Sequence, residues 1–263
     1  MHKELSLHPG EAAGRPRLHV ALAQSEAEVR EAQRLRYKVF VEEFGARLQT
    51  RLPDHDVDFY DAYCEHLIVR DLSRGRVIGT YRILAPEAAA RVGGYYSENE
   101  FCLTRLQHLR SRTVEIGRSC VHQDYRSGGV IALLWSGLAD YMLASGHDYL
   151  IGCASIGMGD GGHNAANLYR ELQASHLAPV EYRVFPLHPL PVDRLGNDQK
   201  ADQKAHVPPL LKGYLRAGAW ICGEPAWDPD FNSADLLVML PMVRLKQRYA
   251  RHFLGEAAEA QVA

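Results

Sequence analysis

Apolar residues recur along the chain with two different periods, and the change of period marks the predicted elements. Runs with strand-like alternation or a high content of β-branched and aromatic residues predict strands at 18–23, 65–71, 76–84, 111–121, 148–156, 180–185, 220–229 and 234–242. Apolar residues at helical spacing predict helices at 25–44, 128–145, 164–172 and 243–254. Ser25 is the expected N-cap of the first helix, with Glu28 completing a capping box.

The order helix, hairpin, strand, helix, strand, helix, strands predicts one mixed α/β domain rather than two domains. We place this domain at residues 18–253, between flexible tails at 1–17 and 254–263. Residues 186–209 contain five of the 13 prolines and many charges, which predicts an exposed loop or flap.

Composition narrows the class of protein. The 263 residues are 46% hydrophobic and 24% charged, with a net charge of -2, so nothing in the overall charge favours nucleic acid. The five cysteines form no CxxC pair, which is typical of reduced thiols in a cytosolic protein. The first 17 residues lack the apolar core of a signal peptide, and the longest apolar stretch, 130–142, is too short to span a bilayer.

Three motifs point to chemistry that the remainder of the chain does not support. Residues 157–162, GMGDGG, match the dinucleotide pattern GxGxxG, but the alternating parallel units of a dinucleotide-binding sheet are missing. His66 and Asp71 spell HxxxxD, yet an odd separation on a strand sends them to opposite faces. The 13 histidines show no ligand spacing on a helix, so we predict no metal.

The segment EIGRSCVHQDYRSGGVIALLW, residues 115–135, joins a predicted strand to a predicted helix through a charged, glycine-containing turn. A helix N-terminus offers unpaired N–H groups and the positive end of the dipole, which suits a phosphate. The residues expected to form this cradle are Arg126, Ser127, Gly128, Gly129 and Val130. An ordinary strand-to-helix turn is the alternative.

The order of elements, with DYRSGG after one strand and AANLYREL after the next, resembles the GCN5-related N-acyltransferase fold. That resemblance implies a central mixed, mostly antiparallel sheet with helices on both faces. It also implies that the turn holds the phosphate of a pantetheine arm. Gly129 matches the first glycine of the family's loop, but Ile131 stands where its last small residue belongs, which disfavours coenzyme A itself.

A second resemblance, over residues 33–121, is to acyl-homoserine-lactone synthases. It rests on Arg36, Phe40, Asp58, Asp61, Arg82, Phe101, Glu115 and Arg118. The chain from 18 to 253, above all LLKGYLRAGAWICGEPAWDPDFNSADLLVMLP, is most similar to bacterial ornithine N-acyltransferases. This similarity implies transfer of a 3-hydroxyacyl group from acyl carrier protein to the α-amine of L-ornithine, giving lyso-ornithine lipid, with no tightly bound cofactor.

The chemistry of this reaction and the positions of the residues suggest individual roles, each with a structural alternative. Glu115 is the expected base, or a paired strand carboxylate; Tyr169 is the expected donor of a proton to the leaving thiolate, or a core residue. Asp58 and Asp61 are expected to hold ammonium groups of the substrate or to cap a loop. Arg36, Arg82 and Arg118 are expected at the substrate site, with Arg36 and Arg118 binding its carboxylate or fixing the acids. A covalent intermediate on Cys120 or Cys153 is a minor alternative.

An acidic acyl carrier protein needs a basic docking surface. Arg105, Arg110 and Arg112 form one candidate and residues 244–252 another, although such clusters are commonly just solvated faces. A lipid product favours peripheral contact of a cytoplasmic protein with the membrane through the last predicted helix.

Two other functions stay open at this point. One is an enzyme of the same shape with another acceptor, an acyl-homoserine-lactone synthase or an N-acyl-amino-acid synthase. The other is a non-catalytic protein that binds lipid or acyl carrier protein.

Overall fold

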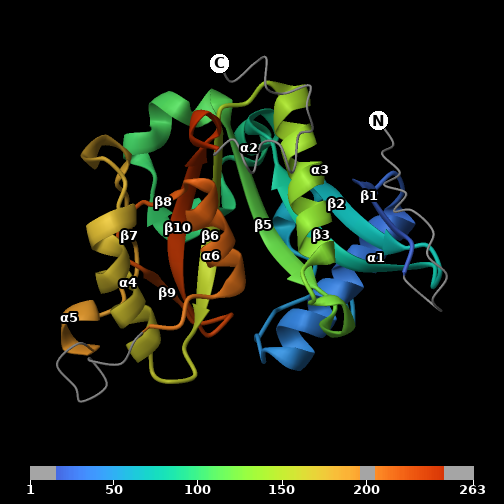
Figure 1. The fold of residues 1–263 in the computed structure, drawn as a ribbon, viewed down its shortest axis with the longest axis horizontal. Helices are drawn as coiled ribbons and strands as arrows, with labels where there is room; N and C mark the ends of the chain where they lie inside the picture. Colours follow the sequence, from blue (N-terminus) through green and yellow to red (C-terminus); the bar gives the residue numbers. More distant parts are fainter. Residues whose placement is uncertain (1–15, 196–204, 246–263) are drawn as a thin grey trace.

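The computed structural model describes residues 16–195 and 205–245 (Figure 1). The predicted tail 254–263 and nearly all of the predicted helix 243–254 lie outside the described residues, as does most of the tail 1–17. No helix in the described ranges is long and apolar enough to cross a bilayer.

The described ranges form ten strands and six α-helices. The strands are β1 Leu18–Leu22, β2 Glu65–Asp71, β3 Arg76–Leu84, β4 Phe101–Cys102, β5 Thr113–Val121, β6 Tyr149–Gly157, β7 Phe185–Pro186, β8 Trp220–Ile221, β9 Ala226–Asp228 and β10 Ser233–Pro241. The α-helices are α1 Glu26–Tyr37, α2 Pro86–Val92, α3 Gly129–Ser145, α4 His163–His176, α5 Val192–Leu195 and α6 Pro209–Ala217.

The chain forms one sheet of eight strands. Seven of them follow the order β1-β2-β3-β5-β6-β10-β8, and the eighth, β9, also pairs with β10. All pairings of this sheet are antiparallel except β5 with β6, which is parallel. A small sheet pairs β4 with β7. The predicted mixed, mostly antiparallel sheet is therefore confirmed.

Helices cover both faces of the large sheet and pack on it through clusters of buried apolar residues. Helices α3, α4 and α6 pack on one face around residues such as Leu134, Leu168 and Leu211, and Figure 1 shows α3 and α6 lying across this face. The opposite face is covered by α1, through Ala32 and Leu35, and by α2, through Ala88 and Ala89. We call these the α3 face and the α2 face.

The first helix starts where the sequence predicts and ends differently. The Ser25 side chain accepts the Glu28 N–H at 3.3 Å, which confirms the N-cap, but the Glu28 carboxylate accepts the N–H of Gln24, one residue earlier than a capping box requires. After Tyr37 the backbone continues as a π-helix over Lys38–Glu43. This wider turn lies beside the candidate site, where such bulges are common.

Two sequence-based predictions of strands are corrected. Residues 180–185 form a 3₁₀ turn, Val180–Tyr182, and only Phe185 joins the short β7, because Pro179 starts the turn instead of continuing an extended chain. Residues 220–229 hold two short strands, β8 and β9, instead of one. Within the predicted loop 186–209, Leu190, Val192 and Ala205 are buried in the core.

Candidate active site

Strands β5 and β6 pair only at their beginnings and then separate. Each strand has nine residues, but the parallel register covers only Thr113 to Glu115 against Tyr149 to Ile151. A cavity of about 650 Å³ opens where they part. Ile156 and Cys153 both line the cavity, and they are an odd number of residues apart on β6. Because alternate side chains of a strand point to opposite faces, the cavity reaches both faces of the sheet.

The two ends of the cavity differ in chemistry. On the α3 face its walls are mostly apolar: Tyr81, Leu150, Ile156, Leu210, Val238 and Leu240. On the α2 face the walls include apolar residues such as Leu84 and Ile151, but they also carry the polar groups of Tyr96, Glu115, Arg118, Cys153, Asp228 and Asp235. The cavity can therefore accept an apolar group from one side of the sheet and a polar group from the other.

Glu115 lies at the branch point, as the last residue of the parallel pairing. Its carboxylate is 4 % exposed and accepts the backbone N–H groups of Tyr96 at 2.6 Å and Ser97 at 2.8 Å. Burial raises the pKa of Glu115, and the hydrogen bonds from Ser97 and Tyr96 offset part of that rise. A buried carboxylate with a raised pKa, held rigidly at a cavity wall, is suited to accept a proton.

Arg36 is completely buried among acids and does not line the cavity. Its guanidinium binds the Asp61 carboxylate through two hydrogen bonds, at 2.7 and 2.8 Å, and Asp56 through two more, at 2.8 Å to the carboxylate and 2.5 Å to the backbone carbonyl. Burial alone would raise the pKa of Asp61, but Arg36 outweighs it and keeps that pKa below its usual range. Of the two predicted roles for Arg36, fixing the acids fits this position; Asp56, its second partner, was missed by the sequence analysis.

Arg82 and Arg118 continue the same network to the cavity wall. Arg82 binds Asp58 at 2.6 Å, and Arg118 binds Asp58 at 3.0 Å and Asp56 at 3.1 Å. The Arg118 guanidinium is also stacked between two rings, 4.8 Å from the centroid of Tyr96 and 4.7 Å from that of Phe231.

This network changes how Asp58 and Asp61 are understood. Three arginines face three aspartates, so the acids predicted to hold substrate ammonium groups already have cationic partners. Asp58 also caps the 3₁₀ turn Phe59–Tyr63, which was the alternative named for it. Their position favours a structural role, in which they hold Arg82 and Arg118 at the cavity.

Tyr169 lies in the core of the α3 face, on α4, and is not among the residues that line the cavity. Burial raises the pKa of its hydroxyl. Two other tyrosines do line the cavity: the hydroxyls of Tyr81 and Tyr214 are 2.7 Å apart, on β3 and α6. Their separation of 133 positions leaves no local signal in the sequence.

The residues of the predicted phosphate cradle lie at the N-terminus of helix α3. Gly128 is the N-cap of α3 with φ +105°, a conformation that favours glycine, and no side chain caps the N–H groups of the first turn. Arg126 donates to Val121 O at 3.0 Å and pairs with Glu43 at 2.5 Å. The Arg126 guanidinium lies over Phe44, which lines the cavity, so the cradle stands beside the cavity mouth.

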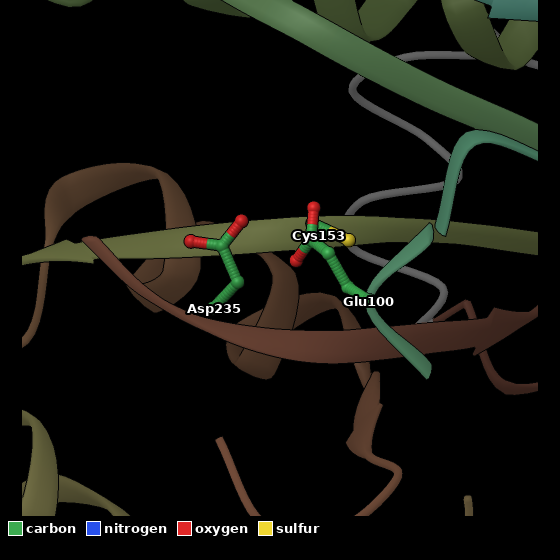
Figure 2. Close-up of side chains that lie close together, drawn as sticks. All are labelled: Glu100, Cys153 and Asp235. Carbon is green, nitrogen blue, oxygen red and sulfur yellow. The ribbon is translucent and has the colours of Figure 1, made fainter. Parts of the chain in front are cut away.

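Asp228 and Asp235 line the α2 face of the cavity and Glu100 lies directly behind this wall, against Asp235 and Cys153; the sequence analysis did not select any of these three carboxyl groups. Burial, followed by the charges of Asp235 and Asp228, raises the pKa of Glu100 to about 9. The carboxyl and thiol groups of Glu100, Cys153 and Asp235 place one ligand atom each within 4.8 Å of one another, and they are the described residues best placed to hold a cation. Figure 2 shows these three side chains gathered at one place.

The thiols are poor candidates for a covalent intermediate. Burial raises the pKa of Cys120, and burial with the negative charges of Glu100, Asp235 and Glu115 raises that of Cys153. Both groups are therefore held as thiols, whereas the nucleophile of a covalent mechanism is the thiolate.

The remaining motifs have structural roles. The Asp160 carboxylate occupies the N-terminus of α4 by accepting the N–H groups of Gly162 and Asn164, so the GMGDGG segment leaves no free phosphate site there. Asp71 accepts the Tyr125 hydroxyl at 2.7 Å, while His66 lies 3.6 Å from Asp61. These two residues of the HxxxxD match therefore have separate partners.

The first predicted docking cluster is largely paired within the chain. Arg110 makes two bonds of 2.8 Å to Glu98, Arg112 pairs with Asp148, and Arg105 donates to Val180 O. The second cluster, 244–252, lies almost entirely outside the described residues.

Comparisons with known proteins agree with this architecture. Residues 35–136 match the family model described as an acetyltransferase (GNAT) domain. The AHL synthase LasI superposes with a TM-score of 0.51 at 14% identity, covering 92% of this chain and 96% of LasI. FeeM, an N-acyl amino acid synthase from uncultured soil microbes, also gives 0.51, at 12% identity over 92% of this chain and 99% of its own. These similarities establish the fold.

Curated sequences are much more similar. The L-ornithine N(alpha)-acyltransferase of Rhizobium meliloti is 36% identical over 91% of this chain and 85% of its own length. Those of Agrobacterium fabrum, at 38% identity, and Rhodobacter capsulatus, at 34%, cover 86% and 96% of their own lengths. The chain therefore belongs to the L-ornithine N(alpha)-acyltransferase family and has a GNAT fold.

Proposed function

We propose that this chain transfers a 3-hydroxyacyl group from acyl carrier protein to the α-amine of L-ornithine and so forms lyso-ornithine lipid. Family membership supports the reaction type and the acceptor. The observation that carries the proposal is the position of Glu115, a buried carboxylate on the wall of a cavity that joins an apolar end to an acidic one.

The reaction needs an unprotonated amine, a thioester and a proton for the departing sulfur. The amine nitrogen attacks the thioester carbon, and Glu115 accepts a proton from that nitrogen directly or through one water. The tetrahedral intermediate then collapses: the C–N bond remains, the C–S bond breaks, and the thiolate takes a proton. The paired hydroxyls of Tyr81 and Tyr214 line the cavity, so in our proposal one of them supplies this proton, the role predicted for Tyr169.

The choice between the two amines of ornithine follows partly from their basicity. An α-amine titrates near pKa ~8 in a peptide and a lysine-like amine near ~10.4, so the α-amine is more often neutral at pH 7. The site must still bring the α-amine to the thioester. Arg118, on the cavity wall beside Glu115, is our candidate for the α-carboxylate, because its guanidinium is fixed by Asp56, Asp58 and the two rings.

The donor would approach from the α3 face. Its phosphate matches the uncapped N–H groups at Gly129 and Val130, and Arg126 adds a positive charge that Glu43 now partly neutralises. The apolar end of the cavity would hold the acyl chain, at about 0.8 kcal/mol for each buried CH₂. We also propose peripheral contact with the membrane for release of such a product. A membrane-bound fraction unaffected by deletion of residues 244–263 would argue against that contact.

A transfer assay read by mass spectrometry tests the proposal. Purified protein receives a 3-hydroxyacyl carrier protein or the matching coenzyme A thioester, with ornithine, lysine, a neutral amino acid or S-adenosylmethionine as acceptor. The proposal predicts α-N-acylornithine from the carrier-bound donor. A product from S-adenosylmethionine or a neutral amino acid would keep the fold and mechanism but give the chain another acceptor. Donor binding without turnover would point to a non-catalytic binding protein.

A further inference from the structure

Three buried carboxyl groups meet at the polar end of the cavity, and we call them the acidic cluster: Glu100, Asp228 and Asp235. They come from the residue before β4, the end of β9 and the start of β10, and they are 9 %, 8 % and 3 % exposed. Asp228 and Asp235 line the cavity itself. Figure 2 shows Glu100 pointing toward Asp235 and Cys153 from the neighbouring segment.

The acidic cluster lacks a counter-charge in the ranges that the structure describes. Asp228 accepts the N–H groups of Asp230 and Phe231, and Asp235 accepts the Ser233 hydroxyl, but neither is in an ion pair. No N–H group donates to either oxygen of Glu100. Asp56, Asp58 and Asp61 are the contrast, because each has an arginine partner. Buried carboxyl groups without a cation are costly, so this arrangement is explained if a cation from outside the chain completes it.

The cluster also stands in a fixed relation to Glu115. The 3₁₀ turn Tyr96–Asn99 supplies both N–H groups that hold Glu115, and the carbonyl of its Ser97 accepts the Glu100 N–H at 3.1 Å. Glu115 on β5 is paired with Ile151 on β6. Cys153, which lies next to Glu100, follows Ile151 by two residues, so the two positions on β6 are roughly 6–7 Å apart. Five covalent bonds separate the two amines of ornithine, which stand roughly 6 Å apart in an extended chain.

We propose that the acidic cluster binds the side-chain ammonium of the acceptor amino acid, while its α-amine lies at Glu115. This proposal rests on the function proposed above and adds to it the basis of acceptor choice. The cluster selects diamino acids, because a neutral side chain would leave the carboxyl groups buried without a partner. Arrival of the ammonium favours the ionised form of Glu100, so a proton held by the empty cluster leaves to solvent.

Acceptor kinetics distinguish this role from a merely structural one. L-Norvaline has the carbon chain of ornithine without the side-chain amine, and lysine has one methylene more. We expect Asp235→Asn and Glu100→Gln to lower kcat/KM for ornithine at least roughly tenfold, as for loss of a charge-assisted hydrogen bond, and not to lower kcat/KM for norvaline. Glu87→Gln, a substitution of the same type at an exposed position on α2, should change neither acceptor. Equal losses for ornithine and norvaline would overturn the proposal.

Calorimetric binding without donor provides a readout that does not depend on turnover. Ornithine should bind more tightly than norvaline, the difference should disappear in Asp235→Asn, and heats in two buffers of different ionisation enthalpy should reveal proton release. Mg²⁺, Mn²⁺ and Zn²⁺ are titrated in parallel. The cluster would be a metal site instead if one of these ions binds stoichiometrically, if ornithine does not displace that ion, and if Asp235→Asn abolishes its binding.

The two proposals fail in different ways. If the wild-type protein acylates no amino acid, the proposed function is wrong, yet a calorimetric preference for ornithine that depends on Asp235 would still support the acidic cluster as its site. If ornithine is acylated but norvaline is acylated equally well, the function stands and the cluster does not select the acceptor.

Discussion

Replacing the ionisable carboxyl of Glu100 by an amide should make the substrate-free protein more stable at neutral pH. Burial and the neighbouring Asp235 and Asp228 raise the pKa of Glu100 to about 9, so the folded protein keeps a proton there that the unfolded chain has released. Glutamine has the same shape and no charge, and its amide N–H can donate to the Asp235 carboxylate. Glu100→Gln therefore removes a cost that only the folded state carries.

The size of this effect follows from proton linkage. An ordinary glutamate has a pKa of about 4.3 in the unfolded chain, and each pH unit above it costs the folded state about 1.4 kcal/mol while Glu100 stays protonated, so the gain at pH 7 is roughly 4 kcal/mol. Because the folded pKa is raised, the stability contribution of Glu100 is fully present below pH ~4.3 and is lost as the pH rises toward about 9. The difference between wild type and Glu100→Gln should therefore be small near pH 4.5 and large near pH 8.

Urea unfolding curves recorded between pH 4.5 and pH 8.5 measure this difference directly. Glu87→Gln is the matched control, since its exposed side chain in the first turn of α2 should change the free energy of unfolding by only a few tenths of a kcal/mol. Parallel pH profiles for wild type and Glu100→Gln would refute the reasoning, because they would show that Glu100 ionises in the folded protein as it does in water.

Three further predictions test separate parts of the site. Gly129→Asp should stabilise the start of α3 by roughly 0.3–1 kcal/mol and yet weaken binding of the acyl donor, whereas Gly129→Asn should weaken donor binding less. An unchanged donor affinity in Gly129→Asp would show that the donor phosphate does not bind at this position. Tyr214→Phe should slow transfer at least tenfold if its hydroxyl protonates the thiolate, while Tyr169→Phe should not, and the reverse result in single-turnover rates would restore the sequence-based assignment. Arg36→Met should lower the free energy of unfolding by about 3–5 kcal/mol, because Asp56 and Asp61 lose their buried partner, and a urea midpoint close to that of wild type would contradict this.

Most of the fold is predictable from the sequence because its elements carry local signals. Strand β10 contains the apolar run LLVMLP, α3 begins at a glycine pair, and Ser25 caps α1, so these elements appear where the pattern of residues indicates them. The predicted strand at 180–185 is wrong because β-propensity there competes with Pro179, which begins a tight turn.

The site is less predictable, since its residues converge from distant parts of the chain. Glu115 stands out because it precedes the glycine turn on a recognisable strand. Asp56 lies in an irregular segment, and only the positions of Arg36 and Arg118 reveal its role as their shared partner. The acidic cluster joins Glu100 to residues more than 100 positions away, and no spacing in the sequence marks it.

In the proposed reaction, Glu115 accepts the proton of the attacking amine. The most direct measurement is the single-turnover rate of α-N-acylornithine formation from 3-hydroxyacyl carrier protein, in wild type and Glu115→Gln, across pH 6 to 9. Because the Gln amide would face the N–H groups of Tyr96 and Ser97, thermal unfolding and donor binding are measured on the same samples. With Glu115 as the base, we expect a folded, donor-binding variant that is slower by roughly 10²-fold or more and that keeps, in its pH profile, only the rise due to titration of the amine itself. A folded Glu115→Gln variant with the rate and pH profile of wild type would contradict it.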